Sequence, residues 1–230
     1  MKIQQTLAIQ LNHQACLSNF CWGEQALLKQ EIEKIIRGQG EPFVYIWGNP
    51  GSGKSHLLQA CCRAYYKHDS AIYLPLDILK EWGPASIEGM SQHDLIALDN
   101  LDAVAGDAYW EEALFHFYNR VRDNDNTCLL ISGQHAPTVS PVRLPDLRSR
   151  LAWGLVVHLK ELSDDLKIVT IQEQAHKRGF HLSTSVAQFL INRCARNMHD
   201  LQSILNQLDD ASLAAQRKIT IPFVKSVLGV

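Results

Sequence analysis

The stretch "GNPGSGKS", residues 48–55, constrains the fold of this chain more than any other part of the sequence. It fits the pattern G-x-x-x-x-G-K-[ST], and it lies between the apolar run "FVYIW" and the helix-like run "SHLLQACCRAYY". Glycines let the backbone turn its N–H groups inward around phosphate oxygens, and the helix that follows presents its positive N-terminal end to the same anion. A strand, a glycine-rich loop and a helix in this order predict a phosphate-binding α/β domain.

This loop predicts which residues hold a nucleotide and its metal ion. We expect Lys54 to reach the β- and γ-phosphates and Ser55 to hold Mg²⁺. A carboxylate at the end of a nearby buried strand completes the Mg²⁺ shell in such proteins, and Asp99 ends the apolar run "LIALD". The full set of predicted nucleotide-binding residues is Gly48, Pro50, Gly51, Ser52, Gly53, Lys54, Ser55, His56 and Leu57.

Asn100 departs from the pattern of an efficient ATPase. Many P-loop ATPases carry an acidic residue at this position, where it positions or polarises the attacking water. An amide can orient water but cannot take its proton. The sequence therefore predicts a protein that binds nucleotide but hydrolyses it slowly.

The periodicity of the chain changes near residue 162. Before it, five short β-rich runs alternate with longer amphipathic stretches, which is typical of a parallel α/β sheet. After it the strand pattern stops, Ser163 is a plausible N-cap, and the chain has helical periodicity up to its end. We expect an N-terminal segment over residues 1–22, an α/β nucleotide-binding domain over 23–162 and a small all-helical lid over 163–230. The predicted strands cover residues 43–47, 71–76, 95–99, 128–132 and 155–159.

Composition limits the classes of protein that remain. The formal charge of −2 and the pI near 6.5 give no overall basic excess, so broad electrostatic attachment to nucleic acid or to an anionic membrane is not indicated. The N-terminus lacks the continuous apolar segment of a secretory signal, and no run approaches the roughly 20 apolar residues of a membrane span. We expect a cytoplasmic protein.

Four segments of the chain carry a family resemblance. They are "GNPGSGKSHLLQA", "LIALDNLDAVAGD", "LPDLRSRLAWGLVVHL" and "AAQRKITIPFVKSVL". Together they resemble the Hda family, the bacterial AAA+ proteins homologous to the initiator DnaA, over nearly the whole chain. The resemblance implies an AAA+ P-loop fold: a five-stranded parallel sheet with helices on both faces, a helical lid, and nucleotide at their junction.

The resemblance also implies a regulatory function. A protein of this family, with ADP or another nucleoside diphosphate or triphosphate and Mg²⁺ bound, is held on the DNA-loaded β sliding clamp of DNA polymerase III. There it makes ATP-bound DnaA hydrolyse its nucleotide after initiation. The helix-turn-helix domain with which DnaA reads origin DNA has no counterpart before Val230. Contact with DNA is therefore expected mainly through the clamp.

Matching motifs suggest roles for individual residues. In "DLRSRLAWG", Arg150 occupies the place of the AAA+ arginine finger that acts in trans, and Arg148 is the competing candidate. Ser132 matches the polar sensor of the γ-phosphate, with Gln134 close enough to compete. The sensors predicted in the lid are His199, where DnaA-like proteins carry an arginine, and Arg196, one helical turn earlier.

Two motifs precede the α/β domain. "QQTLAI" resembles the clamp-binding peptide of the family, with Gln4, Leu7 and Ile9 as its anchors, although a chance match in a tail without function remains an alternative. Phe20 and Trp22 stand where AAA+ proteins place the segment that covers the base, and they line the base pocket or fill the core.

Two other functions remain open on the sequence alone. The P-loop also fits a self-sufficient ATP motor or helicase loader, against which Asn100 and His199 argue. A single-stranded DNA-binding AAA+ module would need a basic stripe with interleaved aromatics, and "AQRKITIPFVK" is a modest candidate. The sequence does not fix the oligomeric state, which includes a homodimer or larger homo-oligomer, nor the preferred base.

Overall fold

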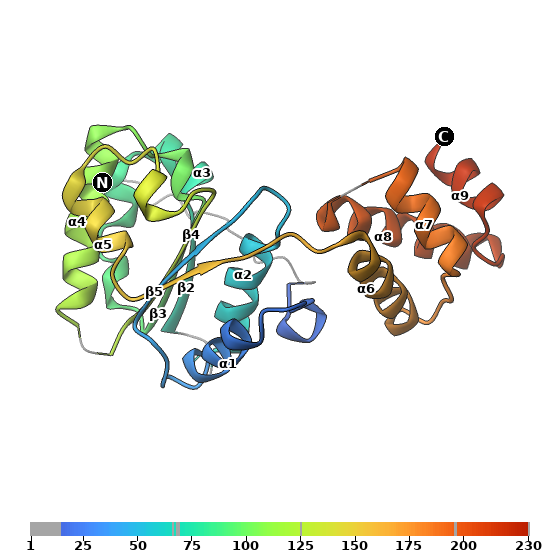
Figure 1. Cartoon of the computed structure of the whole chain (residues 1–230), viewed down its shortest axis with the longest axis horizontal. Helices are drawn as coiled ribbons and strands as arrows, with labels where there is room; N and C mark the ends of the chain where they lie inside the picture. The colour runs from blue at the N-terminus through green and yellow to red at the C-terminus, as the bar shows by residue number, and fades with distance from the viewer. Residues whose placement is uncertain (1–14, 66, 68–69, 125, 196, 230) are drawn as a thin grey trace, which may run out of the picture. The chain divides into compact units, whose positions relative to one another are not determined.

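A five-stranded parallel sheet forms the centre of the first part of the chain (Figure 1). The computed structural model describes residues 15–65, 67, 70–124, 126–195 and 197–229. The strands lie in the order β2-β3-β4-β1-β5, and every neighbouring pair is parallel, which confirms the predicted fold class. Their bounds are Phe43–Trp47 (β1), Ala71–Pro75 (β2), Leu95–Asp99 (β3), Cys128–Gly133 (β4) and Leu155–His158 (β5).

Helices cover both faces of this sheet because its strands are apolar on both sides. Successive residues of β3 alternate between two clusters: Ile96 and Leu98 face one cluster, and Leu95 and Ala97 face the other. The helices of the first cluster are α3 (Leu76–Leu79), α4 (Ala108–Arg122) and α5 (Pro145–Leu151), and those of the second are α1 (Ala26–Ile35) and α2 (Lys54–Ala64).

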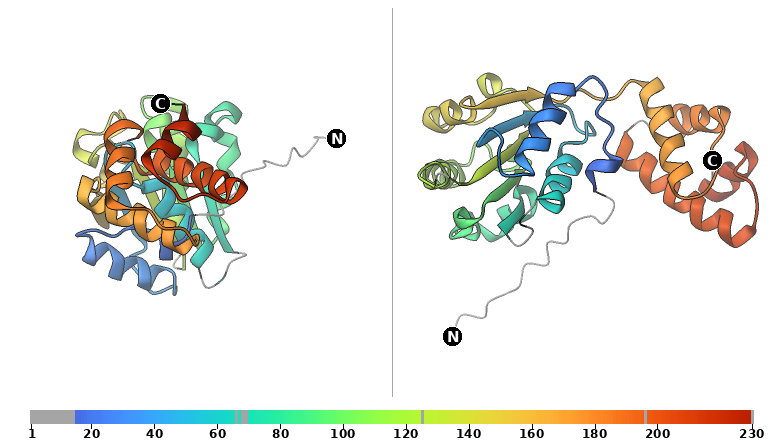
Figure 2. Two further views of the ribbon diagram at one scale, coloured as in Figure 1. Left: turned by 90° about the vertical axis from the view of Figure 1, so that its right-hand side faces the viewer. Right: turned by 90° about the horizontal axis from the view of Figure 1, so that it is seen from below.

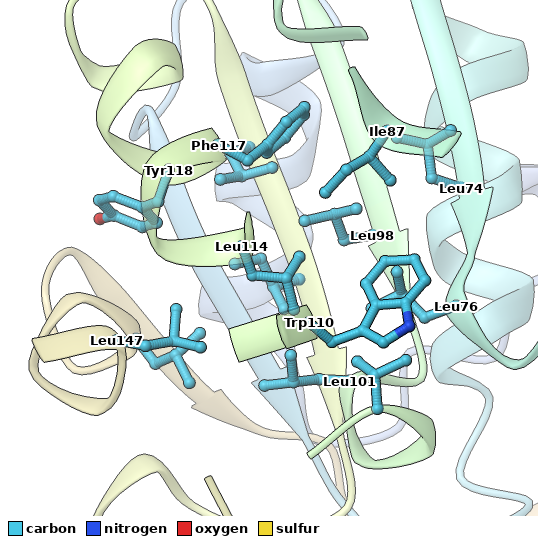
Figure 3. Close-up of a cluster of buried hydrophobic side chains, with 14 of the residues drawn as sticks. Leu74, Leu76, Ile87, Leu98, Leu101, Trp110, Leu114, Phe117, Tyr118 and Leu147 are labelled. Atoms are coloured by element: carbon cyan, nitrogen blue, oxygen red, sulfur yellow. The ribbon is translucent and has the colours of Figure 1, made fainter. Parts of the chain in front are cut away.

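Three aromatic side chains of α4 belong to the core, whereas Tyr109 of the same helix is exposed. Trp110, Phe117 and Tyr118 are buried with leucines of the sheet and of α5 (Figure 3). Figure 3 also shows the hydroxyl of Tyr118 pointing away from the other labelled side chains.

Short 3-10 turns lie between the strands and helices of the first part of the chain and before α1. They are η1 (Leu17–Asn19), η3 (Lys80–Trp82), η4 (Pro84–Ile87), η5 (Met90–Gln92), η6 (Leu101–Ala103) and η7 (Pro137–Val139).

The second part of the chain is helical and has an apolar cluster made only of its own residues. Its helices pack against one another (Figure 2). Ser163, the predicted N-cap, accepts a hydrogen bond from the Leu166 N–H at the start of the first of them. The helices are α6 (Asp164–Lys177), α7 (Thr184–Arg193), α8 (Met198–Ala215) and α9 (Ile221–Leu228).

The backbone contacts divide the chain into two compact units. The first contains residues 1–49 and 54–159, and the second contains residues 160–230 together with the loop residues 50–53. The division predicted from the sequence lies three residues later, after residue 162. Among the described residues, no helix is both long and apolar enough to cross a membrane.

Candidate functional site

The carboxyl ends of three adjacent strands bring the predicted site residues together. Strand β4 lies between β3 and β1, and Ile46 of β1 pairs with Ser132 of β4. The P-loop leaves the end of β1, and Asp99 is the last residue of β3. Because parallel strands end at one edge of a sheet, residues far apart in sequence meet there.

The P-loop turns where its glycines permit it. Gly51 has φ +83° and Gly53 has φ +97°, values that side-chain-bearing residues rarely adopt. The Lys54 ammonium donates hydrogen bonds to the Gly48 carbonyl at 2.7 Å and to the Asn49 carbonyl at 2.9 Å. Burial lowers the pKa of Lys54, while the negative charges of the two nearby carboxylates, Asp99 and Asp102, act in the opposite direction.

Asp99 is a buried carboxylate held by two hydroxyl groups. Its side chain is 4% exposed. The Tyr73 hydroxyl donates to one carboxylate oxygen at 2.5 Å, and the Ser132 hydroxyl donates to the other. Burial, with the adjacent charge of Asp99, raises the pKa of Tyr73, so Tyr73 remains a neutral donor. Tyr73 was not among the predicted site residues, because tyrosine is common in β-strands and does not by itself indicate a functional site.

Ser132 also accepts a hydrogen bond from the backbone of Asn100, at 2.9 Å. The predicted sensor therefore connects the ends of β3 and β4. Asn100 itself is in the left-handed region, with φ +62° and ψ +60°. Asparagine tolerates this conformation better than most residues with a side chain, because its short polar side chain can bond locally. The Asn100 side chain thus suits the left-handed turn after β3, and it is also the amide that stands where many P-loop ATPases carry a carboxylate.

A second carboxylate, Asp102, binds the segment that follows β4. It accepts a hydrogen bond from the Gln134 N–H at 2.6 Å, and its other oxygen lies 2.8 Å from Nδ1 of His135. Both oxygens are engaged, so Asp102 positions this loop. Gln134, the competing sensor, is exposed and makes this contact through its backbone.

The donors present fit a nucleotide–Mg²⁺ complex. Asp99 provides one carboxylate, and Ser55 provides a hydroxyl at the start of α2. Mg²⁺ is usually bound through one or two carboxylates, with phosphate oxygens and water filling the other positions. Within the described ranges, no group of three or more His, Cys, Asp or Glu could hold a metal ion alone. The arrangement fits a metal ion that arrives with a phosphate chain.

The predicted base-covering residues lie against α2. The Phe20 and Trp22 rings meet edge to face with centroids 4.7 Å apart, and Phe20 lies 5.8 Å from the ring of His56. His56 Nε2 is 3.3 Å from the Cys16 carbonyl. Burial is the larger effect and lowers the pKa of His56, and the Cys16 carbonyl acts in the opposite direction. Phe20 and Trp22 are partly buried against the α1–α2 cluster, so they pack on the core and keep some exposed surface.

Arg150 lies at the opposite edge of the sheet from the P-loop. Its guanidinium carbon is 5.3 Å from the centre of the Trp153 ring, and that ring stacks on Phe43 with centroids 6.4 Å apart. Phe43 is the first residue of β1, whereas the P-loop follows Trp47, the last residue of β1. Four steps of about 3.3 Å separate these two strand ends by about 13 Å.

A buried glutamate fixes the helix that carries Arg150. Glu111 of α4 is 2% exposed, and its carboxylate accepts N–H groups from Arg143 and Leu144 at 2.7–3.0 Å and from Gly106 at 2.6 Å. Leu144 is the N-cap of α5. Sequence reasoning missed Glu111, because an acidic residue in the first turn of a helix is ordinary on an exposed surface.

Several predicted residues cannot be placed. Gln4, Leu7, Ile9 and Arg196 lie outside the described residues, as does the side chain of His199.

Comparisons with known proteins show what this chain is similar to. Residues 164–228 match the family model of the Hda lid domain. An uncharacterised protein of Haemophilus influenzae is 43% identical over 231 residues, covering all of both chains.

Solved structures share the fold. Domain III of the Thermotoga maritima replication initiation protein DnaA superposes with a TM-score of 0.77, at 18% identity, covering 96% of this chain and 98% of that one. AMPPCP-bound DnaA from Aquifex aeolicus gives 0.71 at 22% identity, over 85% of this chain and 65% of that one. A RuvB variant of Thermotoga maritima gives 0.66 at 15% identity, over 90% and 69%. At these identities the likeness shows a shared fold and no more.

Proposed function

Because this chain belongs to the Hda-like AAA+ proteins, related to the replication initiator DnaA, we propose that it regulates initiation by stimulating ATP hydrolysis on DnaA. In this proposal the chain acts in the cytoplasm with a nucleoside diphosphate such as ADP and Mg²⁺ bound. It is held on the β sliding clamp through Gln4, Leu7 and Ile9, and it provides Arg150 as an arginine finger.

The position of Arg150 is the observation that carries this proposal. An arginine at the Phe43 end of β1 is far from the P-loop at the Trp47 end of the same strand. It therefore suits a nucleotide held by a neighbouring subunit. A guanidinium is permanently charged and can donate to two phosphate oxygens, so it stabilises the charge that develops on the transferring phosphoryl group.

The chain's own site is suited to holding a nucleotide. Lys54 and the P-loop N–H groups bind phosphates, Ser55 and Asp99 hold Mg²⁺, and Tyr73 and Ser132 orient the Asp99 carboxylate. Bound Mg²⁺ would neutralise phosphate charge there. Asn100 supplies an amide without a base, so the site retains nucleotide better than it hydrolyses it.

The test follows labelled ATP on DnaA in the presence of DNA-loaded clamp. Wild type should accelerate hydrolysis, and Arg150→Ala should reduce the stimulated rate on the order of 10³-fold or more, as trans-acting fingers do elsewhere. Arg148→Ala is the matched control, from the same helix, and should keep most of the stimulation. No stimulation by wild type would exclude the function, and full stimulation by Arg150→Ala would exclude the finger.

A second variant separates nucleotide binding from the finger. Lys54→Ala should lose ADP binding in calorimetry and thereby lose stimulation, whereas Arg150→Ala should bind ADP normally. Isolated wild-type protein should hydrolyse ATP more slowly than the roughly 1 s⁻¹ at which active enzymes begin. A faster rate would favour an autonomous ATPase.

A further inference from the structure

The proposed finger rests on the face of an exposed tryptophan. Trp153 is 52% exposed, and the Arg150 guanidinium carbon lies 5.3 Å from its ring centre. This distance is within the range in which an aromatic face attracts a cation. Among the residues that the structure describes, Arg150 forms no ion pair. The face of the indole is thus a neighbouring group that can stabilise its charge.

A second guanidinium lies near the same ring. The Arg122 guanidinium lies 5.8 Å from the Trp153 ring centre. Arg122 also has a carboxylate nearby, Asp123, at 3.6 Å. Arg122 therefore has a carboxylate within ion-pair distance, whereas Arg150 has none among the described residues.

The ring is itself held in place. Trp153 stacks on Phe43 with 12° between the planes, and Phe43 stacks on Tyr118 with 24° and centroids 4.6 Å apart. These contacts join the segment after α5 to β1 and α4. Burial raises the pKa of Tyr118 to about 12, against the smaller lowering effect of Arg150 and Arg122, so Tyr118 adds no negative charge to the cluster.

The turn that presents Trp153 depends on the next residue. Gly154 has φ +85°, and a Cβ added to it would lie 2.9 Å from the Cβ of Phe43 and closer still to the Phe43 carbonyl oxygen. The Trp153 N–H donates to the Arg150 carbonyl at 3.0 Å. The backbone therefore folds the indole back under the arginine that precedes it by three residues.

We infer that Trp153 is a positioning residue that orders the Arg150 guanidinium before a partner's nucleotide arrives. The inference rests on the proposed function of Arg150. A flexible arginine loses side-chain freedom when it engages a phosphate, and a ring that already restricts it reduces that loss. The ring remains about half exposed, so the guanidinium can still reach outward.

The first test is independent of catalysis. In NMR spectra, the Arg150 side-chain signals of wild type should be displaced by the ring current of Trp153, with the assignment made by their absence in Arg150→Ala. In Trp153→Leu they should move toward free-arginine values. Trp82→Leu, which changes a tryptophan of similar exposure (50%) elsewhere on the surface, should leave them unchanged. Unchanged Arg150 signals in Trp153→Leu would overturn the inference whatever the protein's function.

The second test uses the stimulated hydrolysis. Trp153→Leu should lower the maximal stimulated rate roughly 3- to 30-fold, the range of a cation–aromatic contact, with little change in the half-saturating concentration. Trp153→Phe should restore most of the rate, because it keeps an aromatic face. A raised half-saturating concentration with an unchanged maximal rate would assign the indole to the partner's surface and overturn the positioning role. Absence of stimulation by wild type would overturn the proposed function, while the NMR result would still decide on the contact.

Discussion

Asn100 combines a strained backbone with a missing carboxylate. Its position in the left-handed region follows directly after the buried Asp99, and its N–H is bonded to Ser132. A residue at this point must turn the chain sharply without disturbing Asp99. For most residues with a side chain this conformation costs about 1–2 kcal/mol, whereas glycine adopts it without a steric cost.

We therefore expect Asn100→Ala to lower the free energy of unfolding by about 1 kcal/mol and Asn100→Gly to lower it by less. Urea denaturation followed by circular dichroism measures both. Asn124→Ala and Asn124→Gly, at an exposed asparagine without a positive φ, are the matched controls and should not show this order. Equal losses for Asn100→Ala and Asn100→Gly would show that the backbone conformation carries no cost.

At the scale of elements, Glu111 joins α4 to the start of α5. Its carboxylate accepts several backbone N–H groups in a buried position. In Glu111→Gln the amide nitrogen cannot accept, so at least one buried N–H loses its partner, at a cost of about 1–3 kcal/mol. Urea denaturation should show this loss. Glu112→Gln, at an adjacent side chain that is 72% exposed, should change the stability little, and equal effects of the two variants would contradict the structural role of Glu111.

His56 makes the contact between η1 and α2 sensitive to pH. Burial holds its pKa below the ordinary value of 6.5, so the unfolded chain binds a proton more readily than the native chain. The stability associated with neutral His56 is complete above about pH 6.5 and declines as the pH falls below that value. His56→Gln should therefore lose less stability than wild type between pH 7.5 and 5.5 in urea denaturation. His116→Gln, at a side chain that is 57% exposed, should follow wild type. A wild-type loss unchanged by His56→Gln would assign the pH dependence to other groups.

The elements were more predictable than their contacts. The β-rich runs predicted all five strands to within one residue at either end, because short apolar runs between amphipathic stretches favour a buried parallel sheet. Asp99 was predicted to lie near the P-loop because it ends a buried strand, and Ser132 was predicted from the family resemblance. The contacts of Tyr73 with Asp99 and of Trp153 with Arg150 did not, because they depend on strand order and on how side chains pack across elements, which periodicity does not encode.

At the scale of the whole molecule, the proposed tether and the nucleotide site use different parts of the chain. Gln4, Leu7 and Ile9 precede the described residues, whereas the P-loop and Asp99 belong to the sheet edge. Deleting residues 1–11 should therefore abolish clamp binding in surface plasmon resonance and leave ADP binding in calorimetry unchanged, since an extended peptide can bind a groove without help from the folded domain. Replacing Gln10 alone with Ala should spare clamp binding. Equal clamp affinity of the truncated and full-length chains would exclude the tether.

Strand β1 has a direction, with the ring under Arg150 at its first residue and the P-loop after its last. A subunit that gives its arginine from one edge and receives one at the other makes a head-to-tail contact, in which the two partners present different surfaces. Such a contact has no twofold axis. A pair built this way engages one nucleotide and one arginine, and leaves one of each uncovered at its two ends. Under the proposed function, only the subunit that offers its nucleotide edge to Arg150 would be stimulated, so the order in which two related subunits stack would decide which of them hydrolyses its nucleotide.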